Sequence, residues 1–503
     1  MSDFLSNMML GLATAATPFN LLMCFVGALL GTFVGVLPGI GPLATMAMLL
    51  PITFYLPPES ALIMLAGIYY GAQYGGSTTA ILARLPGETS SVVTCLDGYQ
   101  MAVQGRAGPA LAIAALASFF AGTVSTLIVA LFAPALAKVA LYFTDYEYFS
   151  LMVLGLVGAV VMARGSVLRA IAMIFVGILI GCVGTDVNTG ISRYTLGFPE
   201  LLDGISFVPI AIGLFGLADI MANLERPREQ PTIKTAGLKG LWPSRSEFRQ
   251  GTPAAVRGTL LGSALGILPG GGAVLASFAS YALERRIAAN PQRFGKGAVE
   301  GLAGPEAANN AGAQTSFIPM LTLGLPSNVV MALMIGAMML QGIQPGPQVM
   351  TERPGLVWGM IVSMWIGNLM LVIINLPLIG IWVQLVRIRY EFLFAMIIVF
   401  CCMGTYGINN SVFDVFIAVV FALFGYLLIK LDCEPAPLAL GMILGPMMEE
   451  NLRRGMQLAN GDPTIFLTRP LSLTFLLLAA ALLCAVAAPA IRRERAEVFD
   501  EAD

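Results

Sequence analysis

Long apolar runs, separated by short polar connections, dominate this chain. The runs Ile205 to Leu224, Val412 to Ile429 and Leu471 to Ala488 each approach the length of about 20 apolar residues that crosses a bilayer as a helix. Comparable runs occur near residues 110–133, 147–163, 167–185, 355–386, 391–403 and 435–447. We therefore expect an all-α polytopic integral membrane protein with about 10–12 transmembrane helices.

One segment rich in glycine and proline occurs twice, at residues 27–44 and 258–276. Both copies carry glycines at four-residue spacing, which is typical of close helix packing in lipid. These glycines are Gly27, Gly31 and Gly35 in the first copy and Gly258, Gly262 and Gly266 in the second. A Leu-Pro-Gly-x-Gly sequence then interrupts the helix, because proline lacks a backbone donor and glycine adopts positive φ. Interrupted hydrophobic segments at matching places in two halves indicate a transporter binding site.

The distribution of lysine and arginine predicts the domain organisation. Residues 225–257 are rich in both, so they should form a cytoplasmic linker. This linker divides the chain into an N-terminal transmembrane repeat, residues 1–224, and a C-terminal transmembrane repeat, residues 258–503.

The same charges predict how each glycine-proline copy meets the membrane. Basic residues flank 258–283 at both ends, which predicts a re-entrant helical hairpin that enters and leaves from the cytoplasm. Residues 1–83 contain neither lysine nor arginine, so we expect the first copy on the opposite side and the two repeats to be inverted. The longer first copy, residues 19–56, also fits two full spans.

The densest polar groups lie beside a second duplicated element, in which Gly-Ala-Gln is followed by Leu-Pro at nearly equal spacing. Polar residues inside a membrane are costly and are therefore functional candidates. The start of a broken helix attracts anions, whereas unwound carbonyls and hydroxyls suit a hard cation, so we expect a sodium site near the same broken helices. The candidate carboxylate-binding residues are Gly39, Gly41, Thr45, Gly75, Gly76, Ser77, Thr78, Thr79, Gly270, Gly271, Gly272, Ser277, Glu306, Asn309, Asn310, Gln314, Ser327 and Asn328.

Each of these features also has a structural interpretation. The glycines at four-residue spacing, taken alone, favour helix packing over ligand contact. The hydroxyls of residues 77–79 can bond to the preceding helical turn. Arg84 and Glu88, at helical spacing, are typical of an interfacial ion pair. Glu306 and the asparagines that follow it are the stronger functional candidates, because an acidic residue within a membrane segment is costly.

Composition excludes several classes of function. Hydrophobic residues make up 57% of the chain and charged residues 11%, and a net charge of −2 argues against a nucleic-acid partner. The chain has no histidine, and its seven cysteines are scattered, mostly inside apolar runs. We therefore expect no metal cluster, no cofactor and no enzymatic activity.

Six stretches resemble the large membrane subunit of the tripartite tricarboxylate transporter family. They are LPGIGPLATMAMLLPITF, YYGAQYGGSTTAIL, PGETSSVVTCLDGYQMAVQGRAGPALAIAALASFFAG, ILPGGGAVLASFASYALERR, GKGAVEGLAGPEAANNAGAQTSFIPMLTLGLPSN and GIQPGPQV. The resemblance implies a multi-pass transporter of the bacterial inner membrane that works with a small membrane subunit and a periplasmic solute-binding protein. It also implies that carboxylates such as citrate are imported with sodium or protons as the coupling ion.

These observations predict a secondary transporter, surrounded by membrane lipid, that imports a citrate-like tricarboxylate or a related organic acid by alternating access. Two alternatives remain. One is a passive channel or exporter for organic anions, which would not concentrate its substrate in the cell. The other is a membrane-embedded enzyme acting on a lipid-linked substrate, which is disfavoured because the chain has no histidine and no paired membrane carboxylates beside a nucleophile.

Overall fold

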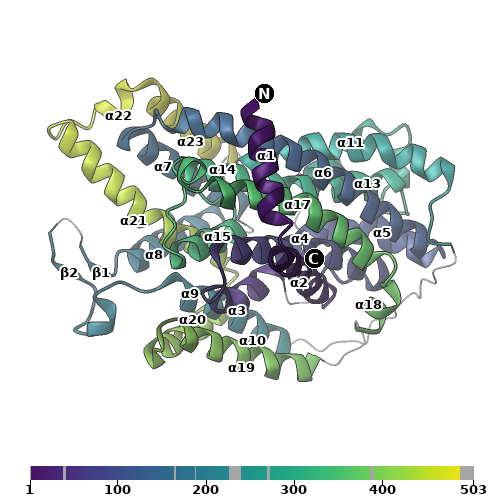
Figure 1. Cartoon of the computed structure of the whole chain (residues 1–503), viewed down its shortest axis with the longest axis horizontal. Helices are drawn as coiled ribbons and strands as arrows, with labels where there is room; N and C mark the ends of the chain where they lie inside the picture. The colour runs from purple at the N-terminus through teal and green to yellow at the C-terminus, as the bar shows by residue number, and fades with distance from the viewer. Residues whose placement is uncertain are drawn as a thin grey trace.

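The computed structural model describes residues 2–37, 41–163, 166–186, 189–225, 240–268, 272–385 and 390–487. Helices account for nearly all the secondary structure of these residues, which confirms the predicted all-α class (Figure 1). The elements before the predicted linker are α1 (Ser2–Ala15), α2 (Pro18–Val36), α3 (Pro42–Thr53), α4 (Pro58–Ala83), η1 (Thr89–Ser91), α5 (Val92–Val103), α6 (Ala107–Ala140), α7 (Asp145–Met162), α8 (Val167–Gly181), β1 (Gly184–Thr185), β2 (Ser192–Arg193), η2 (Pro199–Leu201), α9 (Phe207–Ala211), the π-helical η3 (Ile212–Leu217) and α10 (Ala218–Glu225).

The second half continues the helical pattern. Its elements are α11 (Arg245–Ile267), α12 (Gly272–Ile287), η4 (Pro291–Arg293), α13 (Val299–Thr315), α14 (Phe317–Leu323), α15 (Val329–Leu340), α16 (Val349–Glu352), α17 (Pro354–Asn375), α18 (Ile379–Leu385), α19 (Tyr390–Asn409), α20 (Val412–Lys430), α21 (Pro435–Leu458), α22 (Ile465–Thr468) and α23 (Pro470–Ala487). Of the predicted linker, residues 226–239 lie outside the described residues. From Arg245 onward the predicted linker is helical, because Ser244 and Glu247 form a capping box that starts α11.

Apolar helices make this a multi-pass membrane protein. Among the described residues, α2, α6, α17 and α20 are long and apolar enough to cross a membrane. Shorter apolar helices accompany them, including α3, α8, α15 and α23. The predicted total of about 10–12 spans and the inversion of the two repeats stay predictions.

Several predicted spans have different boundaries in the structure. The run 355–386 is divided between α17 and α18, because Pro377 interrupts the helix two residues after α17 ends. The run 435–447 continues as α21 to Leu458, where ion pairs between residues four apart support the charged end of the helix. The run 205–224 includes the π-helical η3 between α9 and α10.

The glycines at four-residue spacing bring two pairs of helices into backbone contact. α2 packs along α4, and a Cβ added at Gly27 or Gly31 would lie 2.2 or 2.3 Å from a carbonyl oxygen of α4. α11 packs along α13 in the same way, and Gly258 and Gly262 have the same two distances. Any side chain at these positions would separate the helices, so here the glycines serve packing.

The packing register of the two helix pairs is the same. The α4 residues contacted are Met64, Ile68 and Ala72, and the α13 residues are Gly304, Ala308 and Gly312. Each α13 residue follows its α4 counterpart by the same number of positions as Leu325 follows Leu85. The sequence duplication therefore corresponds to a structural duplication of α2 to α4 in α11 to α13.

The helices on either side of the second Pro-Gly break fold back on each other. Arg257 of α11 donates to Glu284 of α12 through Nε at 2.7 Å and Nη2 at 2.6 Å. The two residues lie at almost equal distances from the break, so α11 and α12 form an antiparallel hairpin. This geometry agrees with the predicted hairpin at 258–283, while its re-entry into a membrane stays a prediction.

A small two-stranded element projects from one edge of the molecule (Figure 1). β1 and β2 pair in antiparallel fashion, with Gly184 opposite Arg193. Ion pairs fasten this element to α21: Arg193 contacts Glu449 at 2.7 Å and Arg453 contacts Asp186 at 2.8 Å. The charged end of α21 thus holds the connection between α8 and η2.

Candidate functional site

Two matching helix breaks define the candidate site. α4 and α14 each end beside a residue with left-handed backbone, Arg84 with φ 57° and Gly324 with φ 68°. A Leu-Pro pair follows in both, and proline prevents the helix from continuing. The chain is then extended at Glu88 and at Asn328, which are the N-cap residues of η1 and α15. The two copies of the duplicated Leu-Pro element therefore have the same backbone conformation.

Each break lies against an interrupted helix of the other half. η1 contacts α12, and α15 contacts α3. A Cβ added at Gly272, the first residue of α12, would lie 3.5 Å from Nδ2 of Asn328. Among the described residues, no side chain caps the first turn of α3, and a Cβ added at Gly41 would meet no atom within 4 Å. The breaks and the interrupted helices thus converge between the halves, with open space at the start of α3.

Glu306 of α13 is the buried acid of this region. Its side chain has 0% exposure. Oε2 accepts from Ser77 Oγ of α4 at 2.8 Å and from Ser118 Oγ of α6 at 3.3 Å, and Oε1 accepts from Thr94 of α5. Asn310 Nδ2 donates to Ser118 Oγ at 2.7 Å and thereby orients that hydroxyl. Three helices, α4, α5 and α6, therefore hold the carboxylate of Glu306 through hydroxyl groups.

A second acid, Glu88, lies at the first helix break. Its Oε1 accepts from the hydroxyl of Ser90 and from Nδ2 of Asn309, the latter at 3.4 Å. The ion pair predicted between Arg84 and Glu88 at helical spacing is wrong, because α4 ends at Ala83 and the chain reverses at Arg84. Glu88 instead connects the break of the first half to α13 of the second.

The duplicated glutamines are buried and incompletely bonded. Gln73 has 0% exposure and Gln314 has 3%. Both amide atoms of Gln73, Oε1 of Gln314 and Oδ1 of Asn309 have no hydrogen-bond partner among the residues that the structure describes. Buried polar atoms in native proteins are normally paired, so unpaired ones at the centre of the molecule point to a ligand or an ion.

Other predicted hydroxyls bond within their own helices. Thr45, Thr78, Thr79 and Ser277 each donate to a carbonyl three or four residues earlier, as the structural interpretation of such residues expects. Ser77 does so as well, in addition to its contact with the acid.

The remaining candidates fall into three groups. Gly75 packs on α2, since a Cβ added there would lie 2.3 Å from the carbonyl oxygen of Thr32. A Cβ at Gly76 would lie 3.1 Å from Cγ of Glu88, so this glycine makes room for the first break. At the second break, Ser327 Oγ donates to the carbonyl of Ser316 at 3.5 Å. Three candidates lie outside the described residues, namely Gly39, Gly270 and Gly271.

Four residues of the acid's surroundings were not predicted. Thr94 and Ser118 bond to Glu306, while Tyr74 and Asn375 line a cavity of about 20 Å³ beside it. The sequence held no local signal for them, because they lie on α4, α5, α6 and α17, far apart along the chain.

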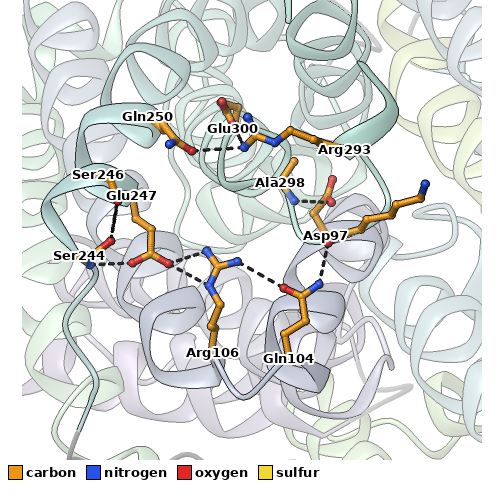
Figure 2. Close-up of polar contacts among 11 residues, drawn as sticks. Asp97, Gln104, Arg106, Ser244, Ser246, Glu247, Gln250, Arg293, Ala298 and Glu300 are labelled. Carbon is orange, nitrogen blue, oxygen red and sulfur yellow. Dashed lines mark hydrogen bonds and ion pairs between the residues drawn. The ribbon is translucent and has the colours of Figure 1, made fainter. Parts of the chain in front are cut away.

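A larger hollow of about 620 Å³ lies between the end of α5, the start of α11 and the loop before α13. Figure 2 shows that its charged side chains face one another: Arg106 Nε donates to Glu247 at 3.0 Å, and Arg293 bonds to Gln250 at 3.3 Å and to Glu300 at 3.2 Å. The charges of Arg106, Glu247, Arg293 and Glu300 are paired within the protein, so these contacts brace the helices.

Asp97 of α5 binds two residues that line this hollow, just before α13 begins. Its Oδ1 accepts from the backbone N–H of Ala298 at 2.7 Å (Figure 2). The backbone N–H of Gly297 donates to the same oxygen, also at 2.7 Å. Oδ2 accepts from the hydroxyl of Tyr281 at 3.1 Å. A residue of the first half thus binds the backbone immediately before the helix that carries Glu306 in the second half.

The model of the tripartite tricarboxylate transporter TctA family matches residues 21–440. This chain belongs to that family. A protein of Agrobacterium vitis, described as an uncharacterized 52.8 kDa protein in TAR-I ttuC' 3'region, is 58% identical over 505 residues that cover both chains fully. Another, described as an uncharacterized protein in TAR-II ttuC' 3'region of the same organism, is 57% identical over 244 residues, which are its full length and 48% of this chain. No solved structure matches the chain.

TctA proteins are membrane subunits of tripartite transporters, which also include a small membrane subunit and a periplasmic binding subunit. The family match includes both helix breaks, Glu306 and Asn375. The resemblance recognised from motifs is therefore confirmed, and every described part of the candidate site lies within the TctA match.

Proposed function

We propose that this TctA chain moves a carboxylate into the cell across the bacterial inner membrane, by alternating access and with an ion gradient as the driving force. In this proposal the periplasmic binding protein delivers a citrate-like tricarboxylate or a related organic acid. The small membrane subunit completes the complex. The chain transports its substrate and does not transform it.

The pair of helix breaks is the observation that carries this proposal. Each break places the beginning of a new helix, at Glu88 or Asn328, against an interrupted helix of the other half. Helix N-termini attract anions through free N–H groups and the helix dipole. The first turn of α3, which no side chain of the described residues caps, supplies such N–H groups.

The duplication supports alternating access. The two copies of one helix arrangement share their packing register. If the copies are inverted in the membrane, the site can open first to one side of the membrane and then to the other. Glu306 and Glu88 lie between the copies and bond to residues of both. A movement of one copy against the other would therefore act directly on these two acids.

Uptake into proteoliposomes tests the proposal. The chain is reconstituted with its small subunit and binding protein, and radiolabelled citrate and a panel of dicarboxylates are supplied with and without a sodium or proton gradient. Accumulation above the external concentration that requires both the gradient and the binding protein supports an ion-coupled importer. Equilibration without accumulation indicates a channel, and net efflux indicates an exporter.

A further inference from the structure

The cavity beside Glu306 has a mixed polar and apolar lining. Its polar lining residues are Glu306, Tyr74, Ser77, Thr78, Ser118 and Asn375. Its volume of about 20 Å³ is room for one water molecule or one small ion. Apolar residues of α4, α6 and α18, together with Leu376, complete the lining.

One acceptor in this wall has no partner. Asn375 is 5% exposed, and its Nδ2 donates to Leu371 O at 2.9 Å and Thr32 Oγ1 at 3.4 Å. With the nitrogen engaged in this way, Oδ1 has no hydrogen-bond partner among the described residues. An unpaired carbonyl oxygen beside a buried carboxylate calls for a proton donor or a cation.

The hydroxyl of Ser77 leads to the same requirement. Its Oγ lies 3.0 Å from Gln73 O and 2.8 Å from Glu306 Oε2, but it has one hydrogen to donate. When the hydrogen points to Gln73, two oxygen lone pairs face each other at the acid. A cation beside both oxygens removes this repulsion, and Ser118 Oγ, which accepts a hydrogen bond from Asn310 Nδ2, adds a further oxygen at 3.3 Å from the carboxylate.

Among the described residues, no basic side chain pairs with the acid. In the parts of the chain that the structure describes, neither lysine nor arginine forms an ion pair with Glu306. The titratable groups near it, Tyr74, Glu88 and Cys95, are not cationic. A buried carboxylate without a positive partner is costly, and oxygen ligands alone are the set that a hard cation prefers.

We propose that a sodium ion binds in this cavity to Glu306 Oε2, Ser77 Oγ, Ser118 Oγ and Asn375 Oδ1. Thr94 holds the other carboxylate oxygen, so that Oε2 faces the ion. This proposal rests on the proposed function and deepens it, because it gives the coupling ion a site built by α4 and α6 of one repeat and α13 and α17 of the other. Sodium would thereby join the two halves.

Isothermal titration of the purified full chain with sodium chloride, at constant ionic strength in choline chloride, tests the site. We expect saturable sodium binding by the wild type, no binding by Glu306→Gln and binding about tenfold weaker in Ser118→Ala, the usual scale for loss of one supporting group. The matched control is Ser125→Ala, because Ser125 lies on the same helix, is equally buried and bonds to Ser263 instead. Its affinity should equal that of the wild type.

Three results would overturn the site: no saturable binding by the wild type, wild-type affinity in a folded Ser118→Ala variant, or proton exchange at Glu306 without any effect of sodium. The uptake assay separates this failure from failure of the proposed function. Carboxylate accumulation driven by a proton gradient, without sodium binding, removes the sodium site and leaves the importer. Sodium binding without transport of any carboxylate leaves the sodium site and removes the importer.

Discussion

The two repeats share their backbone arrangement but differ in their chemistry. Both pack a glycine-bearing helix on a broken helix in one register, and both end that break with a left-handed residue, a Leu-Pro pair and a cap. The first repeat contributes mainly hydroxyls, such as Ser77, whereas the second contributes Glu306 and the amides of Asn309 and Asn310. The duplication therefore preserves packing, and the candidate site arises where the diverged side chains meet.

Alanine at equivalent glycines tests whether the packing is shared, and it has the largest expected effect. An added Cβ at Gly31 or Gly262 would lie 2.3 Å from a backbone carbonyl oxygen, which cannot move without separating the helices. We expect Gly31→Ala and Gly262→Ala each to lower the free energy of unfolding by about 3 kcal/mol. Thermal denaturation followed by fluorescence-detected gel filtration measures this.

The matched control for the glycine test is Gly407→Ala in α19, where a Cβ would meet no atom within 4 Å. Alanine there should be neutral or should stabilise the helix by up to about 1 kcal/mol. A large effect in one repeat and none in the other would show that the two helix pairs do not share their packing.

The ion pair of the second hairpin marks a difference between the repeats. Arg257 and Glu284 correspond to Val26 and Thr53 in the first repeat, which carry no charge. Glu284 is 2% exposed, so Arg257→Ala leaves a buried carboxylate unpaired. We expect this variant to lower the free energy of unfolding by about 2 kcal/mol. The loss is smaller than for a fully buried pair, because Arg257 is partly exposed. A double-mutant cycle with Glu284→Gln in the same denaturation assay isolates the pair.

The control for this cycle is Arg293→Ala, which breaks the more exposed pair with Glu300 and should cost less than about 1 kcal/mol. Equal losses at Arg257 and Arg293 would mean that the hairpin does not depend on its ion pair.

The left-handed residues after α4 and α14 give the smallest expected effect. Arg84 carries a side chain at φ 57°, which costs about 1 kcal/mol relative to glycine, so Arg84→Gly should raise stability by about that amount. Gly324→Ala should lower stability by at least as much, because its Cβ would also lie 2.6 Å from the carbonyl oxygen of Pro345. Thermal denaturation of both variants checks the opposite signs, and a loss in Arg84→Gly would contradict the account.

Local signals predicted the repeated elements of the fold. Glycines at four-residue spacing and the Pro-Gly and Leu-Pro interruptions act through the nearest turns of the chain, so the helix pairs and the breaks could be located from sequence. The same reasoning identified Glu306 and Asn310. Pro86 was also available as a signal that α4 ends before Glu88, and the predicted pairing with Arg84 ignored it.

Long-range contacts account for what was missed. Thr94, Ser118 and Asn375 come from three separate helices, and a single hydroxyl or amide in an apolar helix has no pattern that distinguishes a ligand from a residue bonded to its own turn. Thr45 and Ser277, in contrast, bond to their own turns in the structure. Only the packing of α5 and α6 on α13, and of α17 on α4 and α6, distinguishes these cases.

The most direct test of the central claim is the initial rate of gradient-driven carboxylate uptake by Asn328→Ala in proteoliposomes with both partner subunits. The control is Ser411→Ala, which removes an N-cap of the same kind from α20, away from the breaks. If the duplicated breaks bind the substrate, Asn328→Ala should lower uptake at limiting substrate by at least about tenfold, or about 1.4 kcal/mol, while Ser411→Ala transports at the wild-type rate. Equal rates in the two variants would contradict a substrate site at the helix breaks.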